Sequence, residues 1–188
     1  MKRLAFLTFC MLAPAASLQA QAAIVLPDKP LSPELARIQD AAYVLRDTLF
    51  AVTGAAARLN RDFQQTSGAS LISRAREVKL ACAAVTRNID APRTAITGAP
   101  AGDRLQERER KRLLGAFDDL AAAAAACAAR FEVLASAGNG EEVRGYGNHD
   151  AQSMVSEIRK YESALDGYFR SMRIPNRPRG AQANPLAG

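Results

Sequence analysis

Four stretches of the chain repeat apolar residues at alternating spacings of three and four, which places these residues on one face of an α-helix. The first stretch consists of Leu35, Ile38, Ala42, Leu45, Leu49, Val52, Ala56, Leu59 and Phe63. The same alternation returns at residues 71–89, 113–134 and 151–172. Because no single helix can bury such a stripe, the four helices must pack their apolar faces together.

The predicted fold class is therefore all-α, an antiparallel four-helix bundle over residues 32–174. Composition agrees, because alanine supplies 39 of 188 residues while β-branched and aromatic residues are sparse. Alternating three- and four-residue spacings favour the shallow crossing of coiled-coil-like packing. The pattern suits a core closed within one chain and equally a homodimer.

Capping residues and breaks indicate the helix boundaries. Ser32, Pro33 and Glu34 offer an N-cap, a proline at the first helical position and an acidic first turn. Asp103 followed by Gln106 resembles a capping box. Breaks rich in glycine, proline or polar residues occur at 65–68, 91–102, 138–140 and 145–148, and Pro175 ends the last helix. We therefore expect a long loop over 91–102, between the second and third helices, and a fourth helix that begins after residue 148.

Residues 1–22 resemble an export signal. Lys2 and Arg3 precede a short apolar run, and small residues lead to a cleavage site at Ala20-Gln21-Ala22. The run is too short to span a bilayer, which argues against the alternative of a membrane anchor. We expect a periplasmic or secreted protein whose mature chain starts near residue 23, with an extended segment over 23–31.

The mature chain retains two cysteines, Cys82 and Cys127, both on predicted core stripes. An oxidising compartment favours a disulfide between them. Alanines surround both cysteines, so the two helix backbones can approach as closely as a disulfide requires. Two buried free thiols are the alternative.

If the cysteines pair, the third helix extends past the end of the second and leaves a gap at one corner. The loop over 91–102 must cross this gap, with Ile96 as the natural plug. A groove there is a candidate site for an anionic small molecule or peptide. Its predicted ligand-binding residues are Arg110, Gln106, Tyr168, Met172, Ile38 and Ala42. The alternative is that the loop fills the corner and that Arg110 lies in solvent, as the mixed charges of residues 107–112 would suggest.

Enzyme and cofactor functions find little support in these residues, and we expect no metal and no cofactor. The single histidine, His149, lies beside a predicted helix start, as a solvent-facing residue would. Covalent haem attachment and a di-iron site both lack their motifs, and the chain lacks the paired histidine and methionine ligands of periplasmic b-type cytochromes. Cys82 and Cys127 also lack the C-x-x-C spacing of redox motifs.

Partner binding is the function that the sequence favours, with small-ligand capture in the corner groove as the alternative. The formal charge of +6 is unevenly spread: residues 23–169 hold 19 basic and 19 acidic residues, and the end of the chain adds Arg170, Arg173, Arg177 and Arg179. Residues 175–188 are predicted to form a disordered basic tail that could contact another envelope protein or an anionic envelope surface. A merely solubilising terminus is the alternative. Nucleic acid is excluded as a partner by the predicted export.

Overall fold

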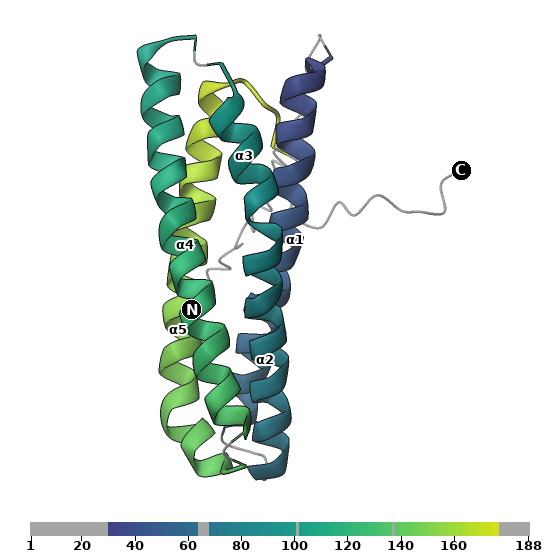
Figure 1. The fold of residues 1–188 in the computed structure, drawn as a ribbon, viewed down its shortest axis with the longest axis vertical. Helices are drawn as coiled ribbons and strands as arrows, with labels where there is room; N and C mark the ends of the chain where they lie inside the picture. Colours follow the sequence, from purple (N-terminus) through teal and green to yellow (C-terminus); the bar gives the residue numbers. More distant parts are fainter. Residues whose placement is uncertain (1–29, 64–67, 101, 137, 177–188) are drawn as a thin grey trace, which may run out of the picture.

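The computed structural model describes residues 30–63, 68–100, 102–136 and 138–176, and within these ranges the chain forms helices and no strand. The elements are α1 (Pro33–Asp62), α2 (Gly68–Asn88), α3 (Asp90–Gly98), α4 (Arg104–Ser136) and α5 (Gly140–Ser171). The four long helices lie side by side, and the short helix α3 lies near one end of the molecule, beyond the end of α2 (Figure 1). The all-helical prediction is confirmed. The predicted signal and the segment up to residue 29 lie outside the described residues.

The predicted apolar stripes form the core. Every residue of the α1 stripe from Ile38 to Phe63 is buried, and Leu35 packs against the core from a half-buried position. The cap of α1 is also as predicted, because the Ser32 hydroxyl accepts a hydrogen bond from the Leu35 amide at 3.3 Å. At the start of α4, the Asp103 carboxylate accepts from the Gln106 amide at 2.8 Å. Local sequence signals therefore place these helix starts correctly.

The prediction of a loop over 91–102 is wrong for most of its length, because residues 90–98 form α3. Pro92 explains the break from α2, since it has no amide hydrogen with which to continue the helical hydrogen bonds. The chain then resumes as a helix, and Pro92 and Ile96 face the core. Ile96 is fully buried, so the residue predicted to plug the corner does so, from a helix rather than a loop.

The fourth long helix begins earlier than predicted. The turn predicted over residues 145–148 is absent, because α5 starts at Gly140 with Asn139 as its N-cap. Two glycines allow close approaches here. A Cβ atom on Gly140 would lie 2.8 Å from the Gly68 carbonyl carbon, and one on Gly147 would lie 3.5 Å from the Phe131 ring. These glycines let α5 pack closely against its neighbours, which offsets their low helix propensity.

Cys82 of α2 and Cys127 of α4 lie at disulfide-bonding distance, with their Cα atoms 6.0 Å apart. Both side chains are buried. Small neighbours allow this approach as predicted, since Ala81, Ala123 and Ala128 pack around the core beside them. The two helices brought together in this way are the pair that the cysteine-bearing stripes predicted.

Candidate functional site

The six residues predicted to bind a ligand do gather at one end of the molecule. Ile38, Ala42 and Tyr168 are buried there, and Met172 packs against the core. The helix α3 contacts both α1 and α4, and Arg93 of α3 forms an ion pair with Asp118 of α4 at 2.5 Å. Side chains of α3 thus occupy the corner that the sequence left for a groove.

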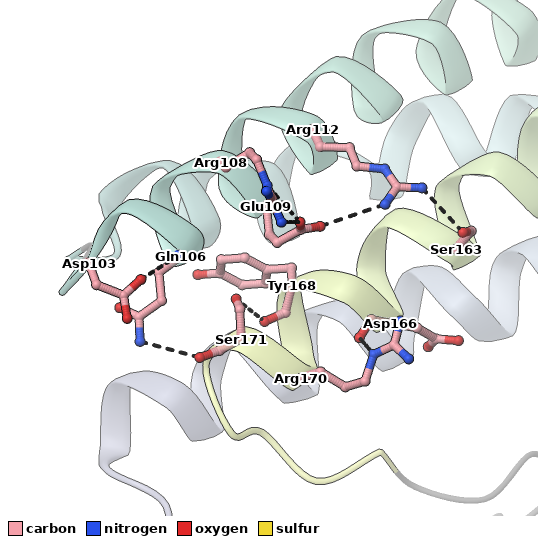
Figure 2. A network of polar contacts seen from close by, with 10 residues as sticks. All are labelled: Asp103, Gln106, Arg108, Glu109, Arg112, Ser163, Asp166, Tyr168, Arg170 and Ser171. Atoms are coloured by element: carbon pink, nitrogen blue, oxygen red, sulfur yellow. Dashed lines mark hydrogen bonds and ion pairs between the residues drawn. The ribbon is translucent and has the colours of Figure 1, made fainter.

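Two of the predicted polar residues make contacts within the chain. Arg110 donates a hydrogen bond to the Ala99 carbonyl oxygen at 2.6 Å and forms an ion pair with Glu107. Gln106 donates to the Ser171 carbonyl oxygen at 3.3 Å, joining the start of α4 to the end of α5 (Figure 2). Arg110 is therefore neither in open solvent nor aimed into a vacant groove. It holds the residue that follows α3.

Tyr168 extends from α5 toward the start of α4, and its ring lies beside Gln106 in Figure 2. The hydroxyl group is buried and has no hydrogen-bond partner. Burial raises the pKa of Tyr168, an effect that the positive charge of Arg110 partly opposes. At neutral pH this group is an uncharged hydroxyl enclosed by protein.

Glu109 of α4 is a nearly buried carboxylate held between two arginines. Its Oε1 accepts hydrogen bonds from Arg108 at 3.1 and 3.2 Å, and its Oε2 lies 3.7 Å from Arg112 (Figure 2). Gly167 of α5 lies opposite, where an added Cβ atom would be 2.8 Å from Oε2 and would make the carboxylate shift. Glu109 thereby holds the guanidinium groups of two arginines whose side chains remain 72% and 58% exposed.

Next to these arginines, an open groove of about 630 Å³ runs along the seam between α4 and α5. It is lined by Lys111, Arg112, Gly115, Ala116, Asp119, Ser156, Arg159, Lys160, Ser163 and Ala164. The two helices pack closely, and Arg112 of α4 reaches Ser163 of α5 at 3.5 Å across the seam. We call this feature the α4–α5 groove.

The α4–α5 groove is basic and has a small-residue floor. Four of its lining side chains are cationic and one, Asp119, is anionic. Lys111 and Lys160 are 75% and 64% exposed, and each pairs with a carboxylate one turn away on its own helix, Glu107 at 3.6 Å and Glu157 at 2.7 Å. The serine hydroxyls and the small floor residues leave room for a ligand between the two rows of basic side chains. This arrangement favours an anion that is contacted from both helices.

The sequence patterns did not predict this groove, although a signal for it is present. Lys111-Arg112 and Arg159-Lys160 are adjacent basic pairs on two predicted helices. Their meeting depends on the relative register of α4 and α5. That register is visible only in the structure, where Glu109 lies against Gly167 and Gln106 against Ser171.

The predicted basic tail is only partly described. Arg170 and Arg173 are exposed, whereas Arg177 and Arg179 lie outside the described residues. The first two residues of the predicted tail contact α1: the Pro175 carbonyl accepts from Gln39 at 2.7 Å, and the Asn176 side chain accepts from Arg46 at 2.9 Å. These contacts tie the end of α5 to α1.

The described ranges hold few other residues or segments that are typical of catalysis, metal binding or membrane insertion. His149 is exposed on α5, about two turns inside the helix rather than beside its start. Over residues 30–63, 68–100, 102–136 and 138–176, no group of three metal-ligating side chains comes together. In the same residues, no helix combines the length and apolar character needed to cross a bilayer.

Comparison with known proteins adds no relative: no family model, no curated protein and no solved structure matches the chain significantly. Functional reasoning therefore rests on the geometry described above.

Proposed function

We propose that this chain is an exported, non-enzymatic binding protein that takes an anionic partner in the α4–α5 groove. The observation that carries the proposal is the opposition of two basic rows across one groove. Lys111 and Arg112 extend from α4, and Arg159 and Lys160 extend from α5. Two facing rows of cations can enclose an anion and make several charge-assisted hydrogen bonds to it.

The proposed ligand is an anion, as the sequence analysis expects, but its site is the α4–α5 groove and not the corner beside Arg110. The sequence patterns put an anionic ligand beside Arg110, whose guanidinium instead contacts Ala99 and Glu107. The α4–α5 groove begins one residue further along α4, at Lys111, on the outer surface of the seam with α5. Gln106, Tyr168, Met172, Ile38 and Ala42 then support the groove by holding the end of the molecule together.

Two further parts of the proposal concern the scaffold and the compartment. We take the four long helices to form an antiparallel bundle, since residue numbers rise along α4 as their partners on α5 fall. Glu109 meets Gly167, and Arg112 meets Ser163.

Export is supported by the signal-like residues 1–22 and by the proximity of Cys82 and Cys127. Fusing residues 1–22 to a reporter enzyme active only after export tests this part, and an inactive fusion contradicts it.

The binding proposal is tested by titrating the purified protein with inorganic triphosphate in a calorimeter. The variant Lys111→Glu/Arg159→Glu reverses one charge on each wall and leaves the Glu109 contacts in place. We expect its affinity for triphosphate to fall by about tenfold or more, because two stabilising charges become repulsive.

The matched control is Arg61→Glu/Arg87→Glu, which makes the same charge change at exposed positions of α1 and α2. It should keep triphosphate affinity within about twofold of the parent at physiological salt, where distant charges are screened. Equal losses in the two variants would show that only net charge matters. The groove would then not be the binding site.

A further inference from the structure

We infer that the partner of the α4–α5 groove is a linear, phosphate-bearing polyanion that continues past the groove toward the end of the molecule where α4 begins. This inference rests on the proposed function, since it names the class of anion that the groove binds. It follows from the continuation of basic side chains beyond the groove, from the engagement of nearby carboxylates, and from the two-walled shape of the groove.

Basic side chains continue where the groove ends. The basic band comprises Arg104, Arg108, Lys111 and Arg112 of α4 and Arg159, Lys160 and Arg170 of α5. All seven residues are exposed, and Arg108, Arg112 and Arg170 can be followed in Figure 2. From Arg104 to Gly115, at the floor of the groove, the distance along α4 is about 16 Å at 1.5 Å per residue. A single compact anion cannot contact the whole band.

Carboxylates near the band are for the most part already engaged. Among the described residues these are Asp103, which caps the start of α4, and Glu107, Glu109, Asp119, Glu157 and Asp166. Glu109 is buried beneath the band, Glu107 pairs with Arg110, and Asp166 pairs with Arg46 at 3.2 Å. Glu157 pairs with Lys160 at 2.7 Å. Asp119 lies within the groove, on the α4 segment beyond Gly115 and away from Arg104. Some of these pairs are with the band itself, since Glu109 pairs with Arg108 and Arg112, and Glu107 also pairs with Lys111 at 3.6 Å. The band keeps a positive excess because seven cations face six carboxylates, two of which are shared with Arg110 and Arg46 outside the band.

A phosphate chain suits this surface better than a membrane does. Each internal phosphate of such a chain carries two charged, non-bridging acceptor oxygens, so one group can accept a hydrogen bond from each wall of the groove. A flat bilayer would contact only the tips of the basic residues and leave the 630 Å³ recess unfilled. Of the large exposed apolar side chains in the described ranges, only Leu105 lies in the segment of α4 that bears the band. The seven residues of the band include no aromatic ring on which nucleic-acid bases could stack.

The test compares polymers of different length and chemistry on the full chain. Inorganic triphosphate, long-chain inorganic polyphosphate, polygalacturonate and vesicles of anionic phospholipid are each titrated against the parent and against Arg104→Glu/Arg170→Glu, neither of which contacts Glu109. Both substituted arginines lie outside the groove lining. Circular dichroism confirms that the variant remains helical, and Arg61→Glu/Arg87→Glu again serves as the charge-matched control.

We expect long-chain polyphosphate to bind the parent at least about tenfold more tightly than triphosphate, with a steeper salt dependence because more counterions are released. The Arg104→Glu/Arg170→Glu variant should lose most of this advantage while its triphosphate affinity stays within about twofold of the parent. Equal affinity for short and long phosphate chains, or tighter binding of polygalacturonate or of vesicles, would overturn the inference and leave the groove proposal standing. Failure of triphosphate to bind the parent would remove the groove proposal as well.

Discussion

Two tyrosine side chains of α5, Tyr161 and Tyr168, place their hydroxyl groups in the protein interior, where no described residue forms a hydrogen bond with them. The Tyr161 ring is fully buried and meets Phe117 edge to face, with the ring centroids 5.0 Å apart. Its ring therefore contributes to packing, while its hydroxyl loses hydration without compensation. A buried polar group of this kind costs about 1–3 kcal/mol.

We predict that Tyr161→Phe leaves the free energy of unfolding unchanged or raises it by about 1 kcal/mol, because the ring is kept and the uncompensated hydroxyl is removed. Chemical denaturation at neutral pH measures this. The control is Tyr43→Phe, which removes a hydroxyl that donates to Asn176 at 3.2 Å and should lower stability by about 0.5–1.5 kcal/mol. A loss from Tyr161→Phe as large as that from the control would contradict the prediction and indicate that the Tyr161 hydroxyl has a partner.

Alkaline pH provides a second measurement on the same residue. Burial raises the pKa of Tyr161 well above its ordinary value of 10.0, so the folded state holds this proton more tightly than the unfolded state does. The resulting stability is fully present below pH 10 and is lost as the pH rises toward the folded-state pKa. The parent should therefore lose stability above pH 10 more steeply than Tyr161→Phe. Parallel pH profiles would contradict this assignment.

At the scale of elements, α3 decides whether the corner is open or closed. It is a nine-residue helix, too short to be stable alone, so its formation depends on packing against its neighbours. Ile96 is its fully buried contact, and the pair between Arg93 and Asp118 ties it to α4. Without this docking, the parts of α1 and α4 that α3 contacts would lose part of their cover.

We predict that Ile96→Ala lowers the free energy of unfolding by about 2–4 kcal/mol, the usual cost of a cavity at a fully buried isoleucine. Denaturant unfolding with an unchanged m-value provides the measurement. Thr97→Ala, at the neighbouring exposed position of α3, is the matched control and should change stability by no more than about 0.5 kcal/mol. If both substitutions were equally mild, α3 would not be docked in solution as it is in the structure.

At the scale of the whole molecule, one covalent link joins two distant parts of the chain. Cys82 and Cys127 are 45 residues apart in sequence, and the loop they close contains α3 and the first turns of α4. Closing a loop of this length reduces the entropy of the unfolded chain, and on the chain-entropy estimate the bond stabilises the protein by about 4 kcal/mol.

We predict that reducing this bond, or replacing both cysteines by alanine, lowers the free energy of unfolding by up to about 4 kcal/mol while the helix content of the folded state is retained. Denaturant unfolding followed by far-ultraviolet circular dichroism, with and without reductant, measures both quantities. The double-alanine variant in reductant controls for effects of the reductant itself. Two titratable thiols in the oxidised, denatured protein would contradict the existence of the bond.

The sequence by itself determined the features that depend on local patterns. Helical periodicity is a property of neighbouring turns, so the spacing of apolar residues is enough to identify the buried stripes of α1, α2 and α4. The Ser32 cap involves only atoms within one turn, and it too was predictable. The proximity of Cys82 and Cys127 followed because both lie on core stripes and small residues surround them.

Only the tertiary structure decided the features that depend on how helices meet. Residues 90–98 contain a proline and resemble a loop, yet they form α3 because Pro92 and Ile96 gain burial against other helices. Residues 145–148 resemble a turn, yet they continue α5, where Gly147 is buried beside Phe131 and Leu59. The α4–α5 groove likewise arises from the relative rotation and register of two helices. Such long-range geometry is set by packing across the whole core, and no local spacing of residues encodes it.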